Sequence, residues 1–354
     1  MALRRIQVSD FRCLQSAELA FDTRLTLVSG PNASGKTSLL EAIYVLGRGR
    51  SFRTRRLDNL IRSGSERFII YGQVDLPDRR TGLGVEGSAQ GVRAKLGGER
   101  VSSLAELAAV LPVQIIDPEV HRLIEEGPSR RRRFLDWGVF HVEHRFIEQW
   151  QRYQQVLKQR NAALKARQSR AAVSAWDAEF VRLGEYIHDA RARYVADLAE
   201  GAREIAARLL GMELSLSYRS GWGRDCSLDE ALRASWAQDQ EAGTTQVGPQ
   251  RAEMNIRLNG THVKDRISRG QQKLLAATLL VAQLRLFPVD ALARPTLLLD
   301  DPAAELDSDR LSELIREVSR QSVQLVVTAL NADFEAFGSP GRRYAIHGGG
   351  IVEL

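Results

Sequence analysis

The chain has 354 residues, of which 44% are hydrophobic and 27% charged, and its 50 basic and 44 acidic residues give a formal charge of +6. This composition excludes a disordered protein and allows two or three domains, each able to bury a core. No apolar stretch reaches the ~18 residues of a membrane span, and the N-terminus lacks the apolar core of a signal peptide, so we expect a cytoplasmic protein. Two distant cysteines, Cys13 and Cys226, argue against a disulfide scaffold or a zinc site. The basic excess favours an anionic partner, nucleic acid first.

The N-terminal part of the chain alternates short apolar runs with turn residues. Runs at residues 3–8 and 25–28 predict strands, the second of which ends at Ser29. After Lys36, leucine and isoleucine recur at helical spacing and predict a helix. Between residues 68 and 100, short apolar segments broken by Gly and Pro predict a β-meander.

Residues 140–215 contain two apolar seams at heptad spacing. One seam runs from Phe146 to Leu164 and the other from Trp176 to Tyr194, with a polar stretch between them. This pattern predicts an antiparallel helical hairpin whose arms are each about 40 Å long. Two ordinary amphipathic helices packed on a globular core are the alternative.

The C-terminal part contains one strongly apolar helix and two short strands. Residues 273–286 predict the helix, and residues 296–300 and 323–330 predict the strands. We interpret residues 338–350 as a loop with a possible final strand.

The segment GPNASGKT fits the phosphate-binding pattern G-x-x-x-x-G-K-[ST] and lies between a predicted strand and a predicted helix. Its glycines let successive backbone N–H groups point at a β-phosphate. The lysine then reaches the β- and γ-phosphate oxygens, and the threonine hydroxyl ligates Mg²⁺. The predicted ATP-binding residues are Gly30, Pro31, Asn32, Ala33, Ser34, Gly35, Lys36 and Thr37.

A second acidic element follows the strand at residues 296–299. Three consecutive leucines indicate a strand buried on both faces, and Asp300 emerges at its C-terminal end. We expect Asp300 in the Mg²⁺ shell and Asp301 as the residue that orients or deprotonates the attacking water. More than 260 residues separate Lys36 from Asp300, so a large insertion that includes the hairpin divides one nucleotide-binding fold.

A further anion site is predicted where the apolar helix begins. Ser268 and Gly270 lie at its N-terminus, where free N–H groups and the helix dipole attract an anion. In a chain that already has a P-loop, this site could contact the γ-phosphate of ATP held by another subunit. A plain serine N-cap is the structural alternative.

These motifs together resemble the ABC-type ATPases of DNA repair and chromosome maintenance. Residues 50–54, 127–136 and 248–251 resemble the RecF family, and the similarity extends over nearly the whole chain. The resemblance implies an α/β fold, an ABC-type P-loop ATPase head with a mixed sheet and an inserted helical-hairpin lobe. We assign residues 1–115 to the N-terminal half of the ATPase lobe, 116–240 to the helical arm lobe, and 241–354 to its C-terminal half.

The resemblance also implies a function. Proteins of this family bind ATP and dimerise head-to-head around two nucleotides, bind single- and double-stranded DNA in the ATP state, hydrolyse ATP slowly, and help RecO and RecR to load RecA at gaps in the SOS response. By position, Ser268, Gly270 and Gln271 match the signature that acts in trans, Asp307 the dimer loop, Thr328 a sensor, and Gln114 the Mg²⁺-sensing glutamine of the catalytic site with Asp301. Gln250 and Glu253 depart from the family pattern, in which His and Asp are expected.

Two arginine clusters are candidates for DNA contact. The run at residues 130–133 follows Pro128 and Ser129, which predict a helix start with Ser129 as its cap. Cations in a first turn oppose the helix dipole, so they indicate an anionic partner, either acidic side chains of the other lobe or DNA phosphates. The second cluster, at residues 48–56, is either a DNA contact or a solvated face. Our candidate DNA-binding residues are Arg50, Arg53, Arg55, Arg130, Arg131 and Arg132.

The absence of a base-reading motif predicts binding to phosphates with a steep salt dependence. One alternative function is the ATPase subunit of a membrane transporter, which the hairpin, the basic clusters and the lack of a histidine at Thr328 disfavour. Another is a scaffold that binds ATP without turnover, because Asp301 stands where the wider ABC class carries Glu.

Overall fold

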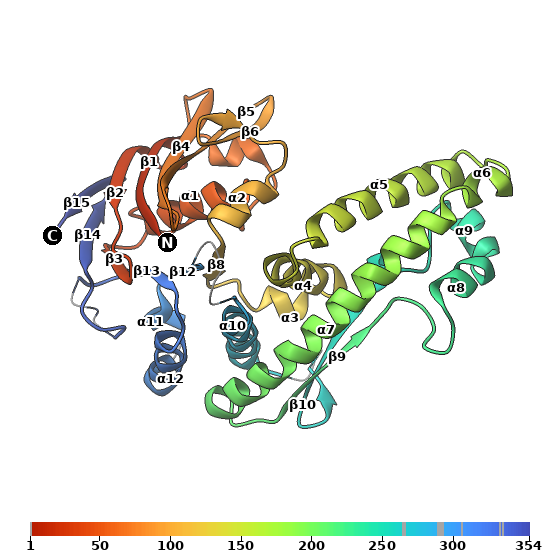
Figure 1. The fold of residues 1–354 in the computed structure, drawn as a ribbon. Helices are drawn as coiled ribbons and strands as arrows, with labels where there is room; N and C mark the ends of the chain where they lie inside the picture. The colour runs from red at the N-terminus through yellow and green to blue at the C-terminus, as the bar shows by residue number, and fades with distance from the viewer. Residues whose placement is uncertain (1, 264–266, 289–293, 306, 333, 335) are drawn as a thin grey trace. The chain divides into compact units, whose positions relative to one another are not determined.

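The computed structural model describes residues 2–263, 267–288, 294–305, 307–332, 334 and 336–354. The chain forms two compact units, one made of Met1–Val120 with Val289–Leu354 and the other of His121–Pro288 (Figure 1). Residues 241–288, which we assigned by function to the ATPase lobe, pack within the second unit. The division into three functional parts stays a prediction.

The first unit contains two six-stranded sheets. One is antiparallel with the order β2-β1-β4-β5-β6-β7, and the other is mixed with the order β15-β14-β3-β13-β12-β8. These strands confirm the predicted strands at 3–8 and 25–28 and the meander at 68–100. Their bounds are β1 Leu3–Phe11, β2 Leu14–Ala20, β3 Leu25–Ser29, β4 Arg67–Asp75, β5 Arg80–Ser88, β6 Gly91–Leu96, β7 Glu99–Arg100, β8 Val113–Ile116, β12 Thr296–Leu299, β13 Gln324–Ala329, β14 Arg342–His347 and β15 Gly350–Glu353.

The main core of the first unit surrounds helix α1 (Lys36–Arg48). Leu39 and Ile43 of α1 are fully buried in one cluster with Ile70 of the antiparallel sheet and Val326 of the mixed sheet. Because α1 is covered by both sheets, nearly all its residues are buried, and the start of this helix is held rigidly. The remaining helices of this unit are η1 Leu57–Leu60, α2 Ala105–Val110, α11 Pro302–Glu305 and α12 Ser308–Ser319.

Residues 338–350, interpreted as a loop with a possible final strand, contain more strand than expected. They contain β14, which pairs parallel to β3, and the start of β15, which pairs antiparallel to β14. Tyr344 and Ile346 point inward into the core, while Ala345 and His347, on the opposite face, are partly exposed or exposed. Only two apolar residues in six face inward, so the alternation was too short to be recognised beside the surrounding glycines.

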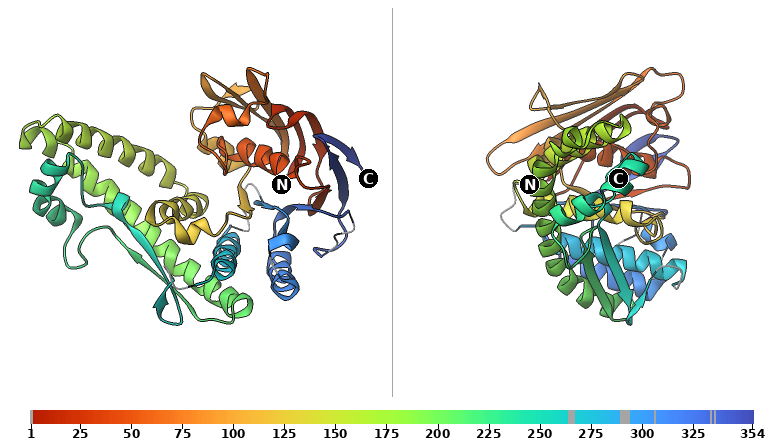
Figure 2. Two further views of the ribbon diagram at one scale, coloured as in Figure 1. Left: turned by 180° about the vertical axis from the view of Figure 1, so that it is seen from behind. Right: turned by 90° about the vertical axis from the view of Figure 1, so that its right-hand side faces the viewer.

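The second unit is built around the 33-residue helix α7 (Asp177–Leu209), which packs against α5 (Phe146–Lys165) as the predicted antiparallel hairpin (Figures 1 and 2). At 1.5 Å per residue the arms measure about 50 Å and 30 Å rather than two equal lengths. A three-stranded sheet of order β11-β10-β9 also packs on α7. The other bounds are α3 Arg122–Glu125, α4 Pro128–Val142, α6 Arg170–Ser174, β9 Leu214–Arg219, α8 Leu228–Ala234, α9 Trp236–Ala242, η2 Pro249–Arg251, β10 Glu253–Leu258, β11 Thr261–His262 and α10 Arg269–Arg285.

The predicted cap of α4 was wrong. The helix begins at Pro128, and its N-cap is Gly127, with φ 83° and no side-chain capping bond, so Ser129 lies inside the first turn. Proline is well suited to the first helical position because its φ is preset and its missing N–H would have no partner there.

Candidate nucleotide-binding site

The predicted phosphate-binding loop connects the buried strand β3 to helix α1. Gly30 has φ 154°, and a Cβ at this position would lie 2.3 Å from the carbonyl oxygen of Ile346, so the loop leaves the sheet where only glycine fits. Gly35, with φ 114°, occupies the N-cap of α1. The first turn of α1 contains no acidic residue, so its free N–H groups and dipole favour an anion.

Lys36 lies over this loop. Its ammonium donates to the carbonyl oxygens of Gly30 at 2.7 Å and Pro31 at 2.9 Å, and the residue is buried. These contacts hold the cation beside the N–H groups of the loop. The arrangement of a helix N-terminus with an adjacent ammonium fits the phosphates of a nucleotide.

Thr37 and Asp300 meet although 263 residues separate them in the chain. Strand β12 lies between β8 and β13 in parallel pairing, and Asp300 follows it at the C-terminal edge of the sheet. There the Thr37 hydroxyl donates to Asp300 Oδ2 at 2.8 Å. A hydroxyl and a carboxylate are oxygen ligands of the kind that Mg²⁺ prefers, so this pair fits a bound magnesium ion.

Thr328 and Asp301 complete this corner of the sheet. The buried Thr328 hydroxyl donates to Asp300 Oδ1 at 2.9 Å and accepts from the Asp301 N–H at 3.0 Å. Asp301 has φ 44°, the left-handed region that is unfavourable for a residue with a side chain. Such backbone strain is concentrated at functional sites, which supports a role for Asp301 in catalysis.

A pocket of about 690 Å³ lies next to the start of the loop. Its lining includes Gly30, Pro31, Asp301, Ala304 and Asn331. Asp301 is half-buried on this pocket and therefore reaches a space that a water molecule or a ligand could occupy.

Gln114 lies below the edge where Asp300 emerges. It is buried within β8 and pairs with Leu297, three residues before Asp300. Asp117 instead follows Ile116, the last residue of β8, which pairs with Leu299, so the chain places Asp117 beside Asp300 at the sheet edge. The roles of Gln114 remain predictions, while Asp117 is a candidate that the sequence analysis missed. Its signal was a buried strand ending in an acid, the same pattern that identified Asp300.

A second group that the sequence analysis missed anchors the P-loop helix. Glu41 is fully buried in α1, and Arg12 donates to both of its carboxylate oxygens at 2.8 and 2.7 Å. Ser51 donates to the same carboxylate, and Arg53 lies 3.6 Å from it. This carboxylate therefore ties the β1–β2 turn and the segment after α1 to the P-loop helix. A lone glutamate within an apolar helix was the available signal.

The three signature residues lie at the start of α10. Ser268 accepts from the Gln271 N–H at 3.2 Å, and Gln271 accepts from the Ser268 N–H at 3.0 Å, which is a capping box. The structural alternative, a serine N-cap, is therefore present. Ser268 and Gly270 are also exposed, so a contact in trans stays a prediction. Asp307 likewise caps a helix, since it accepts from the Arg310 N–H at 2.9 Å at the start of α12.

The arginine run at the start of α4 has partners inside its own unit. Arg131 donates to both carboxylate oxygens of Glu253 at 2.8 and 2.9 Å, and Arg132 donates to the Ala252 carbonyl at 2.8 Å. Arg130 pairs with Glu126 at 2.7 Å. These contacts favour a structural role for the run. The candidate residues Arg50, Arg53 and Arg55 are exposed, and of these Arg53 also lies beside Glu41.

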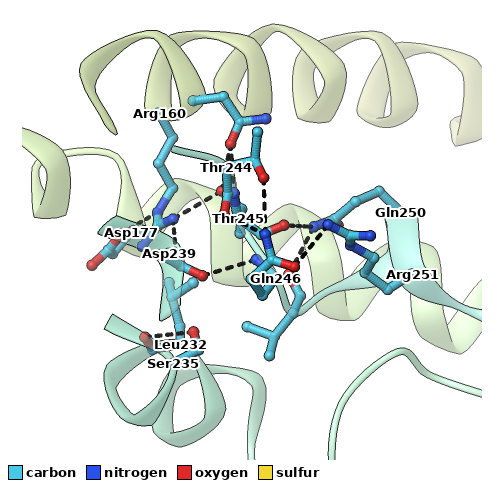
Figure 3. Close-up of polar contacts among 12 residues, drawn as sticks. Arg160, Asp177, Leu232, Ser235, Asp239, Thr244, Thr245, Gln246, Gln250 and Arg251 are labelled. Carbon is cyan, nitrogen blue, oxygen red and sulfur yellow. Dashed lines mark hydrogen bonds and ion pairs between the residues drawn. The ribbon is translucent and has the colours of Figure 1, made fainter. Parts of the chain in front are cut away.

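The segment at residues 244–251 is held by a buried ionic node made of Arg160, Asp177, Asp239 and Thr245 (Figure 3). Arg160 donates to Asp239 Oδ2 at 2.7 Å, to Thr245 Oγ1 at 2.8 Å and to Asp177 Oδ1 at 2.9 Å. In the same segment, Gln250 donates to the Val247 carbonyl at 2.8 Å and accepts from the Tyr153 hydroxyl. The amide of Gln250 therefore has a structural role, because both its oxygen and its nitrogen are hydrogen-bonded.

Comparison with known proteins identifies the relatives of this chain. The family model for the RecF/RecN/SMC N-terminal domain matches residues 2–339. The chain is 38% identical to the DNA replication and repair protein RecF of Aliivibrio salmonicida over 94% of both chains, and 39% identical to that of Yersinia enterocolitica over 99% of this chain and 98% of the relative. A solved structure described as the recombination mediator protein RecF with ATP in the RecFOR pathway has a TM-score of 0.89 at 27% identity, covering 99% of this chain and 97% of that one.

The same comparisons support the predicted ATPase-head fold. An SMC head domain from Pyrococcus furiosus has a TM-score of 0.61 at 16% identity over 99% of this chain and 96% of that one. The alternative of a transporter ATPase subunit is not supported, because the matching family is that of RecF, RecN and SMC. Within the described part of the chain, no helix has both the length and the apolar character needed to cross a membrane.

Proposed function

This chain belongs to the RecF branch of the RecF/RecN/SMC family, and on that premise we propose that it is a DNA replication and repair protein in which ATP-driven dimerisation gates DNA binding. The proposal includes weak ATP hydrolysis that resets the dimer, action with RecO- and RecR-like mediators in the loading of RecA at gaps, and a cytoplasmic location. The named relatives are DNA replication and repair proteins, and the solved relative with ATP belongs to the RecFOR pathway.

The observation that carries the ATP part of the proposal is the meeting of Thr37 and Asp300 beside the loop that holds Lys36. A bound Mg²⁺ would neutralise phosphate charge at this place. Lys36 and the loop N–H groups bind the phosphates, Thr37 and Asp300 supply oxygen ligands, and Asp301 orients the attacking water. The aspartate side chain is one methylene shorter than the glutamate of the wider ABC class, which favours slow turnover.

The surroundings of Gly270 support a partner surface at the signature. Gly270 is the second residue of α10, directly after the N-cap and Arg269, and it is exposed. A Cβ on Gly270 would meet only Ser268 Oγ, at 3.9 Å, so nothing within the described chain requires glycine there. The absence of a side chain lets a surface of another molecule approach α10 closely, as the proposed head-to-head dimer requires.

The gate is tested by fluorescence anisotropy of a gapped DNA. We expect ATP with Mg²⁺, but not ADP, to tighten DNA binding by the wild-type protein. Gly270→Arg should abolish this effect, because an arginine side chain would occupy the space that the partner needs. This substitution is sharper than one at Ser268, since it leaves the capping box of α10 intact.

The matched control is Ala196→Arg, which adds the same charge to an exposed position on helix α7. It should keep the response to ATP. DNA affinity that ignores the nucleotide, or a Gly270→Arg protein that still responds to ATP, would contradict the gate. Tightening by ATP with no release of phosphate would instead support the scaffold alternative.

A separate prediction concerns where DNA phosphates bind. Each phosphate contact contributes a slope of about −0.9 to the dependence of log affinity on log salt concentration. Replacing both Arg50 and Arg55 by glutamine should therefore reduce the magnitude of the slope by about 2, as measured by anisotropy titrations from low to moderate salt. In the control Arg131→Gln, whose arginine pairs with Glu253, we expect reduced stability and an unchanged slope. Equal slopes for the wild-type and double-variant proteins would exclude these two contacts.

A further inference from the structure

Thr328 is placed where it acts on both aspartates of the site. It is fully buried near the end of β13. Its hydroxyl lies 2.9 Å from Asp300 Oδ1 and 3.4 Å from the carbonyl oxygen of Leu299, and it accepts from the Asp301 N–H at 3.0 Å. A hydroxyl has one proton to donate. Asp300 Oδ1 is the better acceptor for it, because it is charged and closer than the Leu299 carbonyl oxygen.

The two oxygens of Asp300 therefore have different tasks. Oδ1 is occupied by Thr328, which leaves Oδ2 facing Thr37 at 2.8 Å. We propose that Thr328 is a positioning residue that fixes the orientation of Asp300, so that Oδ2, beside Thr37, would be the oxygen offered to a Mg²⁺ ion, and that links this carboxylate to the strained backbone of Asp301. The inference rests on the proposed binding of ATP with Mg²⁺ and deepens it.

Two features of the position separate this role from its alternatives. A residue that senses the γ-phosphate directly needs an accessible side chain, whereas Thr328 has none of its surface exposed. A residue needed only for packing could be valine, which has nearly the same shape but no hydroxyl. Valine would leave Asp300 Oδ1 without this donor and the Asp301 N–H without this acceptor.

The test is a Mg²⁺ titration of ATP binding in the full chain. A fluorescent ATP analogue is bound at increasing Mg²⁺, so the readout is the Mg²⁺ concentration at half-maximal binding rather than turnover. Loss of a residue that orients a metal ligand typically weakens metal affinity about 10- to 100-fold. We expect Thr328→Val to raise the Mg²⁺ midpoint by about that factor and Thr328→Ser, which keeps the hydroxyl, to restore it.

Urea unfolding without nucleotide separates this role from a merely structural one. A Thr328→Val protein that is less stable but has the wild-type Mg²⁺ midpoint would overturn the proposal. If Thr328→Val does not fold, Thr328→Cys, with its weaker donor, takes its place and must shift the midpoint in the same direction. Lys36→Ala gives the baseline for lost nucleotide binding. A wild-type protein that matches this baseline at every Mg²⁺ concentration would overturn the proposed function itself.

Discussion

Asp239→Ala lowers the free energy of unfolding of the second unit by about 3–5 kcal/mol, the range expected when one partner of a buried ion pair is removed. Arg160 has no exposed surface, and its Nη1 donates to Asp239 Oδ2 at 2.7 Å. The other oxygen of Asp239 accepts from the Gln246 N–H at 2.8 Å. The substitution therefore removes the buried counter-ion of Arg160, leaves it with the partly exposed Asp177, and frees the 244–251 segment. Urea unfolding followed by circular dichroism measures the loss.

A surface ion pair provides the control for this stability prediction. Asp229 pairs with Arg233 at 2.7 Å, and both side chains are largely exposed. Exposed pairs contribute at most about 1 kcal/mol, so Asp229→Ala should change stability little. Replacing both buried partners, as in Arg160→Met with Asp239→Leu, should recover part of the loss because no fully buried charge is left unpaired, and Asp177, which also loses Arg160, is partly exposed to water. An Asp239→Ala protein as stable as Asp229→Ala would show that the node does not hold the unit together.

Lys36→Ala weakens ATP binding by about 10- to 150-fold. A hydrogen bond to a charged group contributes about 1.5–3 kcal/mol, and 1.4 kcal/mol corresponds to a factor of ten. Lys36 lies within 3 Å of two loop carbonyls and carries the only ammonium or guanidinium among residues 30–37, so no neighbour in the loop replaces it. Isothermal titration with ATP and Mg²⁺ measures the change.

Unfolding of the Lys36→Ala variant shows whether a loss of ATP affinity comes from the binding site or from a less stable fold. Lys36 contacts its own loop, so the free energy of unfolding without nucleotide should stay close to that of the wild-type protein. Lys36→Arg provides a second comparison, because the planar guanidinium does not reproduce a compact ammonium. ATP affinity that is unchanged in Lys36→Ala would mean that the loop is not the phosphate site.

The nucleotide site was predictable because its parts are local. Two short segments predict it: a glycine-containing loop between a strand and a helix, and a leucine strand that ends in Asp300. Each pattern is recognisable within about ten residues. The meeting of Thr37 with Asp300 then follows from the parallel order of β3, β13 and β12. The hairpin was also predictable, since heptad spacing over two long segments is a strong signal.

The features that were missed depend on distant partners or on register. Arg131 finds Glu253 across 122 residues and Arg160 finds Asp239 across 79, and such pairs leave no periodic pattern in the chain. Asp117 follows a buried strand, which the sequence shows, but its place beside Asp300 is known only from the pairing of Ile116 with Leu299. The C-terminal segment gave only a weak strand signal, because just two of the six residues of β14 are buried.

The central claim is that ATP brings two copies of this chain together, and the most direct measurement is molar mass by sedimentation velocity. The account predicts a monomer of 39.5 kDa without nucleotide or with ADP and a species of twice that mass with saturating ATP and Mg²⁺. Gly270→Arg and Lys36→Ala should stay monomeric under all three conditions. A wild-type protein that remains a monomer with saturating ATP, at concentrations where its binding of ATP is demonstrated, would contradict the account.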